Sequence, residues 1–123
     1  FITVHCPKNA ETIDLFDARR LGLMKPTAYI VNTARGGIVN EQALHDILAA
    51  ERIAGAGVDV FVKEPAPVDH PLLKLPNVVL APHMAGVSKE ALERMSVVAV
   101  ENILSVLDGR PMKDNAVNPE VFG

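Results

Sequence analysis

Short apolar runs alternate with helical patterns along most of this 123-residue chain. The runs lie at residues 2–5, 28–32, 54–60 and 78–80. Continuous apolar runs of strand length, separated by helices, are typical of parallel strands that are buried on both faces. The pattern therefore predicts an α/β fold, in which helices cover both faces of a parallel sheet.

Three helices are expected between and after these strands. Asp17 begins a short helix that a Lys-Pro pair stops, because proline lacks an amide hydrogen and clashes with the preceding turn. Asn40 is a typical N-cap for a second helix, whose apolar residues share one face. The longest helix covers residues 88–108 and ends before a glycine. The proline-rich segment 63–76 is expected to be a loop, and residues 110–123 an extended tail.

Polar and ionisable residues follow every predicted strand. In a parallel sheet the carboxyl ends of the strands meet at one edge, and ligands bind there. The pattern therefore predicts a binding or catalytic site at this edge. The residues brought there are His5, Cys6 and Pro7 after the first strand, Thr33 to Gly37 after the second, Asp59 and Glu64 after the third, and His83, Ala85 and Gly86 after the fourth.

His83 is the natural acid/base candidate in this set, because histidine titrates near neutral pH without any perturbation. A carboxylate beside it, such as that of Glu64, would fix its tautomer. The structural alternative is that His83 caps the long helix or bonds to backbone.

Arg35 carries a permanent charge on a planar fork that suits a carboxylate or a phosphate. Its alternative is an ion pair at the surface.

Asp59 ends a buried apolar strand, which is a costly place for a carboxylate unless a ligand or a donor meets it. A cap on a neighbouring backbone amide is its structural alternative. The pair Gly36-Gly37 would let the backbone approach a ligand, or would simply form a turn. No spacing supports a thiol–imidazole pair of Cys6 and His83. The histidines and the cysteine also lack metal-ligand spacing, so no metal site is expected.

Composition and charge narrow the class of protein. Hydrophobic residues make up 49% and charged residues 22%, as in an ordinary globular domain. The net charge of −3 is spread without blocks, which disfavours a nucleic-acid or anionic membrane surface. The single cysteine, Cys6, cannot form an internal disulfide, so a reducing cytoplasm is expected. An apolar strand that begins at Phe1 also leads us to expect a fragment of a longer protein.

Several longer motifs follow one another along the chain. They are Val4-His5-Cys6-Pro7, VNTARGGIVNEQAL at 31–44, AGAGVDVF at 54–61, Glu64-Pro65, NVVLAPH at 77–83 and NAVNP at 115–119. In this order they resemble the D-isomer-specific 2-hydroxyacid dehydrogenases over essentially the whole chain. The resemblance implies the second half of a doubly wound, Rossmann-type parallel sheet with helices on both faces. Residues 1–108 would be the C-terminal half of the NAD-binding domain, and residues 109–123 an extended tail toward the substrate domain.

The resemblance also implies an oxidoreductase that transfers a hydride between NAD and a D-2-hydroxy acid or 2-keto acid. Arg35 is similar to the arginine that binds the substrate carboxylate, His83 to the acid/base, and Glu64 to the carboxylate paired with that histidine. Positions similar to the family's cofactor contacts are Cys6, Thr33, Ala34, Arg35, Asp59, His83 and Gly86. The expected substrates are 3-phosphoglycerate or hydroxypyruvate and glyoxylate. The expected assembly is a homodimer, and NADP stays open as the cofactor.

The chain departs from the family pattern because it lacks the sequence motif that binds the cofactor's phosphates and ribose. No G-x-G-x-x-G follows any strand, and no acidic residue is placed to bind the adenosine ribose. We therefore expect the isolated chain to bind NAD weakly, to turn nothing over and to associate. A milder departure is Ser88, where threonine is common. The alternative functions are a non-catalytic, corepressor-like module that senses NAD(H), and a truncated product with no role of its own.

Overall fold

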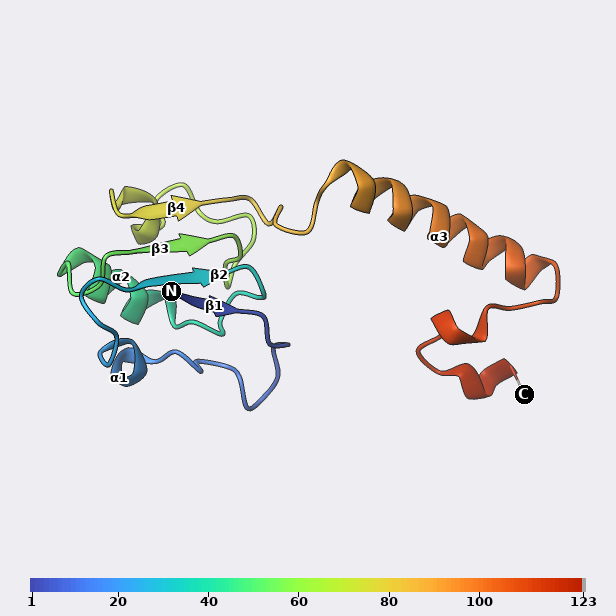
Figure 1. Cartoon of the computed structure of the whole chain (residues 1–123), viewed down its shortest axis with the longest axis horizontal. Helices are drawn as coiled ribbons and strands as arrows, with labels where there is room; N and C mark the ends of the chain where they lie inside the picture. Colours follow the sequence, from blue (N-terminus) through green and yellow to red (C-terminus); the bar gives the residue numbers. More distant parts are fainter. Residues whose placement is uncertain (123) are drawn as a thin grey trace. The chain divides into compact units, whose positions relative to one another are not determined.

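Four short strands form one parallel sheet in the computed structural model, which describes residues 1–122. The strands are β1 (Ile2–Val4), β2 (Tyr29–Asn32), β3 (Gly55–Val58) and β4 (Val78–Leu80). They lie side by side in chain order and point the same way (Figure 1). The predicted parallel sheet is confirmed. Its first three strands are shorter than the apolar runs, because residues at the ends of the runs leave the ladder for the loops.

The chain divides into two units, one containing residues 1–85 and the other beginning at Gly86. The first unit holds the sheet, α1 (Ala18–Leu21) and α2 (Glu41–Ala49). The second holds α3 (Lys89–Leu107) and the C-terminal segment. None of the helices within the described residues is long and apolar enough to cross a lipid bilayer.

Local capping explains where the two helices of the first unit begin. The Asp17 carboxylate accepts a hydrogen bond from the Arg20 amide at 2.7 Å, as its N-cap assignment predicts. The Asn40 side chain likewise accepts one from the Ala43 amide at 2.9 Å. The first helix ends at Leu21, earlier than the Lys-Pro pair suggested, because three-residue turns replace helical bonds after it.

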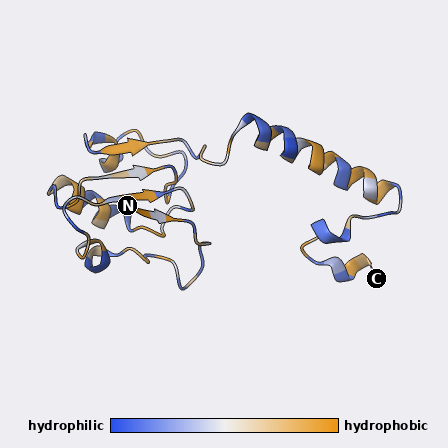
Figure 2. Cartoon of the chain, in the orientation of Figure 1, coloured by the Kyte–Doolittle hydropathy of each residue, from blue (hydrophilic) through white to orange (hydrophobic). Residues whose placement is uncertain are grey.

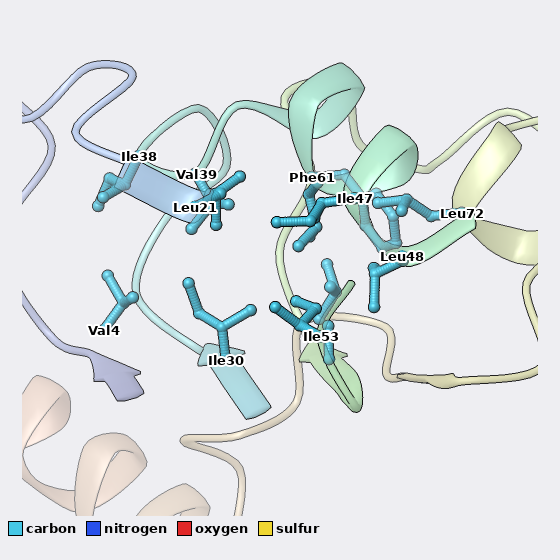
Figure 3. Close-up of a cluster of buried hydrophobic side chains, with 13 residues drawn as sticks. Val4, Leu21, Ile30, Ile38, Val39, Ile47, Leu48, Ile53, Phe61 and Leu72 are labelled. Carbon is cyan, nitrogen blue, oxygen red and sulfur yellow. The ribbon is translucent and has the colours of Figure 1, made fainter. Parts of the chain in front are cut away.

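Both helices bury their apolar sides against one face of the sheet. Ile30 of β2, Leu21 of α1 and Leu48 of α2 are each almost fully buried in this core. Figure 3 shows these side chains between the strands and the helices. The opposite face of the sheet carries Val31, Gly57 and Val79, and Val79 is 76% exposed. Within the first unit, the covered face is therefore the face that α1 and α2 occupy.

The proline-rich segment 63–76 is more ordered than predicted. Residues Pro71–Lys74 form a short 3₁₀-helix, η1, so the expectation of an irregular loop is wrong there. The His70 side chain caps this turn by accepting a hydrogen bond from the Leu72 amide at 3.3 Å. Leu72 itself is completely buried in the core. A local cap and one buried anchor thus order a segment whose composition indicated only a loop.

The second unit contains one long helix followed by two short turns. Ser88 caps α3 by accepting a hydrogen bond from the Ala91 amide at 3.1 Å. None of the helix residues is buried, and polar and apolar residues are interleaved along it (Figure 2). The tail after it was expected to be extended. That expectation is wrong where the 3₁₀ turns η2 (Lys113–Asn115) and η3 (Pro119–Phe122) form, the latter beginning at a proline whose backbone suits a helix start.

Candidate active site

The carboxyl ends of the strands carry three hollows that share lining residues. The first, of about 580 Å³, brings together Asp59, Glu64 and His83. The second, of about 650 Å³, is lined mainly by the loops after β1 and β2; its residues are His5, Cys6, Pro7, Lys8, Thr33, Ala34 and Arg35. A third, of about 300 Å³, shares Asp59 with the first hollow and Thr33 with the second. Apart from Gly36, Gly37 and Gly86, the residues predicted at this edge each line one of the three hollows.

His83 and Glu64 form a carboxylate–imidazole pair at the mouth of the first hollow. The His83 Nδ1 and Glu64 Oε2 atoms lie 2.8 Å apart, and both side chains are partly exposed, by 44% and 37%. Among the described residues none bonds to His83 Nε2, so that nitrogen is available to a ligand. Ser88 rather than His83 caps α3, which leaves the pairing with Glu64 as the side chain's interaction.

The Glu64 carboxylate is held in its charged form. Its hydrogen bond with His83 lowers its pKa most, and the Phe61 amide, which donates to Oε1 at 2.9 Å, lowers it further. Partial burial and the charge of Asp59 oppose this shift. An ionised carboxylate accepts hydrogen bonds only, so Nδ1 of the imidazole must donate to it. In the neutral imidazole this leaves the lone pair on Nε2, which can then accept a proton.

Asp59 has a different task from Glu64, although both follow β3. Asp59 is only 4% exposed, and its two carboxylate oxygens accept hydrogen bonds from the amides of Met84 and Ala85, at 2.8 and 2.9 Å. Its carbonyl accepts a third from the His83 amide at 2.8 Å. These donors offset the cost of burying the charge. Asp59 therefore shapes the turn that presents His83, and its contact with a cofactor stays a prediction.

That turn holds His83 in an unusual backbone conformation. Its φ of 57° lies in the left-handed region, which residues other than glycine seldom adopt. Such a conformation costs on the order of 1 kcal/mol or more and persists only where surrounding contacts impose it. The bonds from Asp59 to the three successive amides supply those contacts. Strain of this kind is concentrated at functional sites.

Arg35 presents its guanidinium group to solvent at the second hollow. Its Nη1 donates to the Ala34 carbonyl at 2.7 Å, and within residues 1–122 no carboxylate forms an ion pair with it. The buried Asn32 fixes the loop that carries it: its side chain accepts from the Ala34 amide at 3.1 Å and donates to the Arg35 carbonyl at 3.0 Å. Sequence reasoning missed Asn32, although a polar residue ending an apolar strand was the available signal.

The pair Gly36-Gly37 makes a turn that packs directly on the backbone after β3. A Cβ atom on Gly36 would lie 2.0 Å from the carbonyl carbon and oxygen of Phe61. Gly37 has φ of 86°, a conformation that suits glycine. The glycines therefore serve close packing between the Arg35 loop and the Phe61 segment.

The structure separates the remaining candidate residues from one another. Cys6 and His83 line different hollows, so the structure does not assemble them into a thiol–imidazole pair. Gly86 begins the second unit and lines none of the three hollows. Within the described part of the chain, no group of three or more His, Cys, Asp or Glu side chains could hold a metal ion.

Comparison with known proteins decides the family. Residues 1–85 match the sequence profile of the family described as "D-isomer specific 2-hydroxyacid dehydrogenase, NAD binding domain". The chain belongs to this family. The match confirms the resemblance drawn from the motifs, the Rossmann-type fold and NAD as the class of cofactor.

Individual relatives extend the likeness beyond residue 85. Over 122 residues the chain is 46% identical to a glyoxylate/hydroxypyruvate reductase B of Pectobacterium carotovorum subsp. carotovorum (strain PC1), covering 99% of the chain and 38% of that relative. It is 44% identical over 117 residues to a D-3-phosphoglycerate dehydrogenase of Archaeoglobus fulgidus, covering 95% of the chain and 22% of the relative.

A solved structure shows the same fold with a cofactor bound. The NAD-dependent formate dehydrogenase from Staphylococcus aureus, in complex with NAD, matches with a TM-score of 0.81 and 39% identity. The match covers 90% of this chain and 34% of that one. The chain thus spans well under half the length of each of these three proteins.

Proposed function

We propose that the chain is the nicotinamide-facing part of an NAD-dependent D-2-hydroxyacid dehydrogenase. The observation that carries this proposal is the 2.8 Å pair of His83 Nδ1 and Glu64 Oε2, placed on the same sheet edge as the solvent-facing Arg35. A base, its orienting carboxylate and a cation for the substrate carboxylate are the protein groups that this reaction requires. Family membership supports the same reaction class.

Each of the three side chains has a defined part in the proposed reaction. During oxidation of a 2-hydroxy acid, His83 Nε2 accepts the hydroxyl proton, and the hydrogen on C2 leaves with its electron pair as a hydride. Glu64 stabilises the imidazolium that forms and keeps its ring oriented. Arg35 binds the substrate carboxylate through its planar fork. In the reverse direction His83 returns the proton to the carbonyl oxygen of a 2-keto acid.

The third hollow fits a nicotinamide ring. It is lined by small and apolar side chains of β2, β3, β4 and the segment after β4, together with Thr33 and Asp59. A flat aromatic ring suits the apolar lining, and its carboxamide suits the two polar residues. When bound, NAD would supply the hydride acceptor. We propose that the residues holding it include Cys6, Thr33, Ala34, Arg35, Asp59, His83 and Gly86.

The names of the relatives support a narrower choice of substrate. One similar protein is named a glyoxylate/hydroxypyruvate reductase and another a D-3-phosphoglycerate dehydrogenase. We infer that this protein reduces hydroxypyruvate and glyoxylate or oxidises 3-phosphoglycerate, in the cytoplasm and as a homodimer. Because relatives have long segments beyond the matched part, we propose this activity for a protein that includes such segments. NADP stays open as the cofactor, since the chain has no residue placed to read the adenosine ribose.

The test is NADH oxidation across a panel of 2-keto acids by the protein in its natural length. Removal of a general acid or base typically costs about 10²–10⁴-fold in rate, so His83→Ala should lose nearly all turnover. Arg35→Ala should lose activity mainly through weaker substrate binding. His45→Ala serves as the histidine control, because His45 contacts Asp46 and lines none of the three hollows. NADH binding without turnover of any acid would favour the NAD(H)-sensing module instead.

A further inference from the structure

We propose that Glu41 and His70 are positioning residues: they fix the Phe61–Val62 segment and, through it, the geometry of the Glu64–His83 pair. This inference rests on the proposed function, because it assigns the pair a reaction to serve. It starts from a second carboxylate–imidazole contact, which the motifs of the sequence gave no reason to expect. Glu41 and His70 are separated by 29 positions along the chain.

Glu41 connects three parts of the first unit. It lies in the first turn of α2, where its Oε1 accepts a hydrogen bond from the Val62 amide at 2.6 Å. Its Oε2 lies 3.1 Å from His70 Nε2, next to η1. The side chains of His70 and Glu41 are only 14% and 22% exposed. Solvent therefore competes weakly for these bonds, which makes them stronger than equivalent surface contacts.

The tautomer of His70 follows from its two partners. His70 Nδ1 accepts a hydrogen bond from the Leu72 amide at 3.3 Å, so in the neutral ring the proton lies on Nε2. Nε2 then donates to the Glu41 carboxylate. The ring also packs edge-on against Phe61, with centroids 5.2 Å apart at an interplanar angle of 76°. His70 thus touches the segment through Phe61 and holds the carboxylate that bonds Val62.

Two adjacent amides of this segment are bound by two different glutamates. The Val62 amide donates to Glu41, and the Phe61 amide donates to Glu64 Oε1 at 2.9 Å. The other oxygen of Glu64 meets His83. A displacement of the segment would therefore move the Glu64 carboxylate relative to the imidazole. A misplacement of about 1 Å can cost on the order of 10²-fold in rate.

The same segment also bears on the Arg35 loop. Gly36, directly after Arg35, packs so closely that a Cβ would lie 2.0 Å from the Phe61 carbonyl carbon and 2.5 Å from the Val62 nitrogen. The Phe61–Val62 segment therefore sets the spacing between the two halves of the proposed site, the Arg35 loop and the Glu64–His83 pair. Glu41 holds it through the Val62 amide, and His70 through the Phe61 ring.

The first test measures the titration of the Glu64 carboxyl carbon by NMR in the intact protein. In the wild type its pKa lies below the ordinary value because His83 and the Phe61 amide bond to it, with Asp59 acting in the opposite sense. Glu41→Ala should raise the pKa of Glu64 toward the ordinary value by loosening the Phe61 amide. His45→Ala is the matched control. His45 also contacts a carboxylate, that of Asp46 at 3.1 Å, whereas the amides of Phe61 and Val62 bond to Glu64 and Glu41.

Two further variants keep the test decisive if Glu41→Ala does not fold. Glu41→Gln keeps an acceptor for the Val62 amide but removes the charge facing His70, and His70→Ala removes the ring and leaves Glu41 in place. Each should give a smaller rise in the same pKa. In the unaltered protein, the amides of Phe61 and Val62 should exchange slowly with solvent. Fast exchange of both amides, or folded variants with an unchanged Glu64 titration, would overturn the inference.

Kinetics separate this inference from the proposed function. With NADH and hydroxypyruvate, His70→Ala should lower kcat by about tenfold or more while KM changes little, because ground-state binding groups stay in place. A merely structural role would lower the amount of folded protein and leave kcat per folded molecule unchanged. If the wild type turns nothing over, the proposed function fails and the Glu64 titration still decides the positioning role. If turnover is high but kcat is unchanged in His70→Ala, only the inference fails.

Discussion

Two carboxylates that follow the same strand have different surroundings, and these surroundings assign their tasks. Asp59 is buried, and its oxygens are occupied by the Met84 and Ala85 amides. Glu64 is partly exposed; one of its oxygens accepts a hydrogen bond from the Phe61 amide and the other pairs with His83. A carboxylate whose two oxygens are both bonded to backbone amides shapes the backbone, whereas one that faces an imidazole fixes the tautomer and orientation of the ring. The burial of each residue therefore separates structural from chemical roles here.

The lowered pKa of Glu64 makes stability depend on pH in a defined direction. A carboxyl group whose pKa is lower in the folded state stabilises that state above its unfolded pKa, close to the ordinary value of 4.5. This contribution is lost as the pH falls through the folded pKa. Urea unfolding should therefore show wild type more stable than Glu64→Gln at pH 7, with the difference shrinking below pH 4.5. A difference that stays constant down to pH 3 would mean that the pair with His83 does not form.

Among the elements, the turn after β2 can pack as it does only because Gly36 has no side chain. Gly36→Ala would place a Cβ against the Phe61 carbonyl, and backbone atoms cannot give way as a flexible side chain can. Overpacking of this kind typically costs about 1–3 kcal/mol. Gly86→Ala is the matched control, because a Cβ there meets nothing within 4 Å. Thermal unfolding should show a clearly lowered midpoint for the first variant and little change for the second; equal midpoints would contradict the packing described.

Sequence patterns predict those elements whose signals are local. The caps at Asp17, Asn40 and Ser88 are confirmed because in each case a short polar side chain accepts a hydrogen bond from the amide three residues on. The gathering of site residues at the strand ends follows from the parallel topology.

Contacts between distant segments left no such signal. Leu72 is fully buried in a segment that composition marks as a loop, because its anchor is the tertiary core. The bonds from Glu41 to His70 and to the Val62 amide join residues more than twenty positions apart, so no periodicity or spacing reveals them. The family resemblance implied roles for Arg35, Glu64 and His83 but gave no sign of these supporting contacts.

At the scale of the whole molecule, apolar surface is left exposed in both units. Val79 on the sheet is 76% exposed, and in α3 Met95, Ile103 and Leu107 are 56%, 61% and 77% exposed. Exposed apolar residues on such a scale favour association. The 123-residue chain, with a mass of 13.2 kDa, should therefore sediment as species larger than a monomer and bind NADH weakly. Ile103→Glu should reduce the association. A monomer with tight NADH binding would contradict this prediction.

In the proposed reaction His83, oriented by Glu64, exchanges a proton with a substrate whose C2 exchanges a hydride with the nicotinamide. The most direct test is the reduction of hydroxypyruvate by NADH deuterated at C4 of the transferring face, using the protein in its natural length. Wild type should form D-glycerate with one deuterium at C2, and His83→Ala should lose this product. L-glycerate, glycerate without deuterium, or equal product from the His83→Ala variant would contradict it.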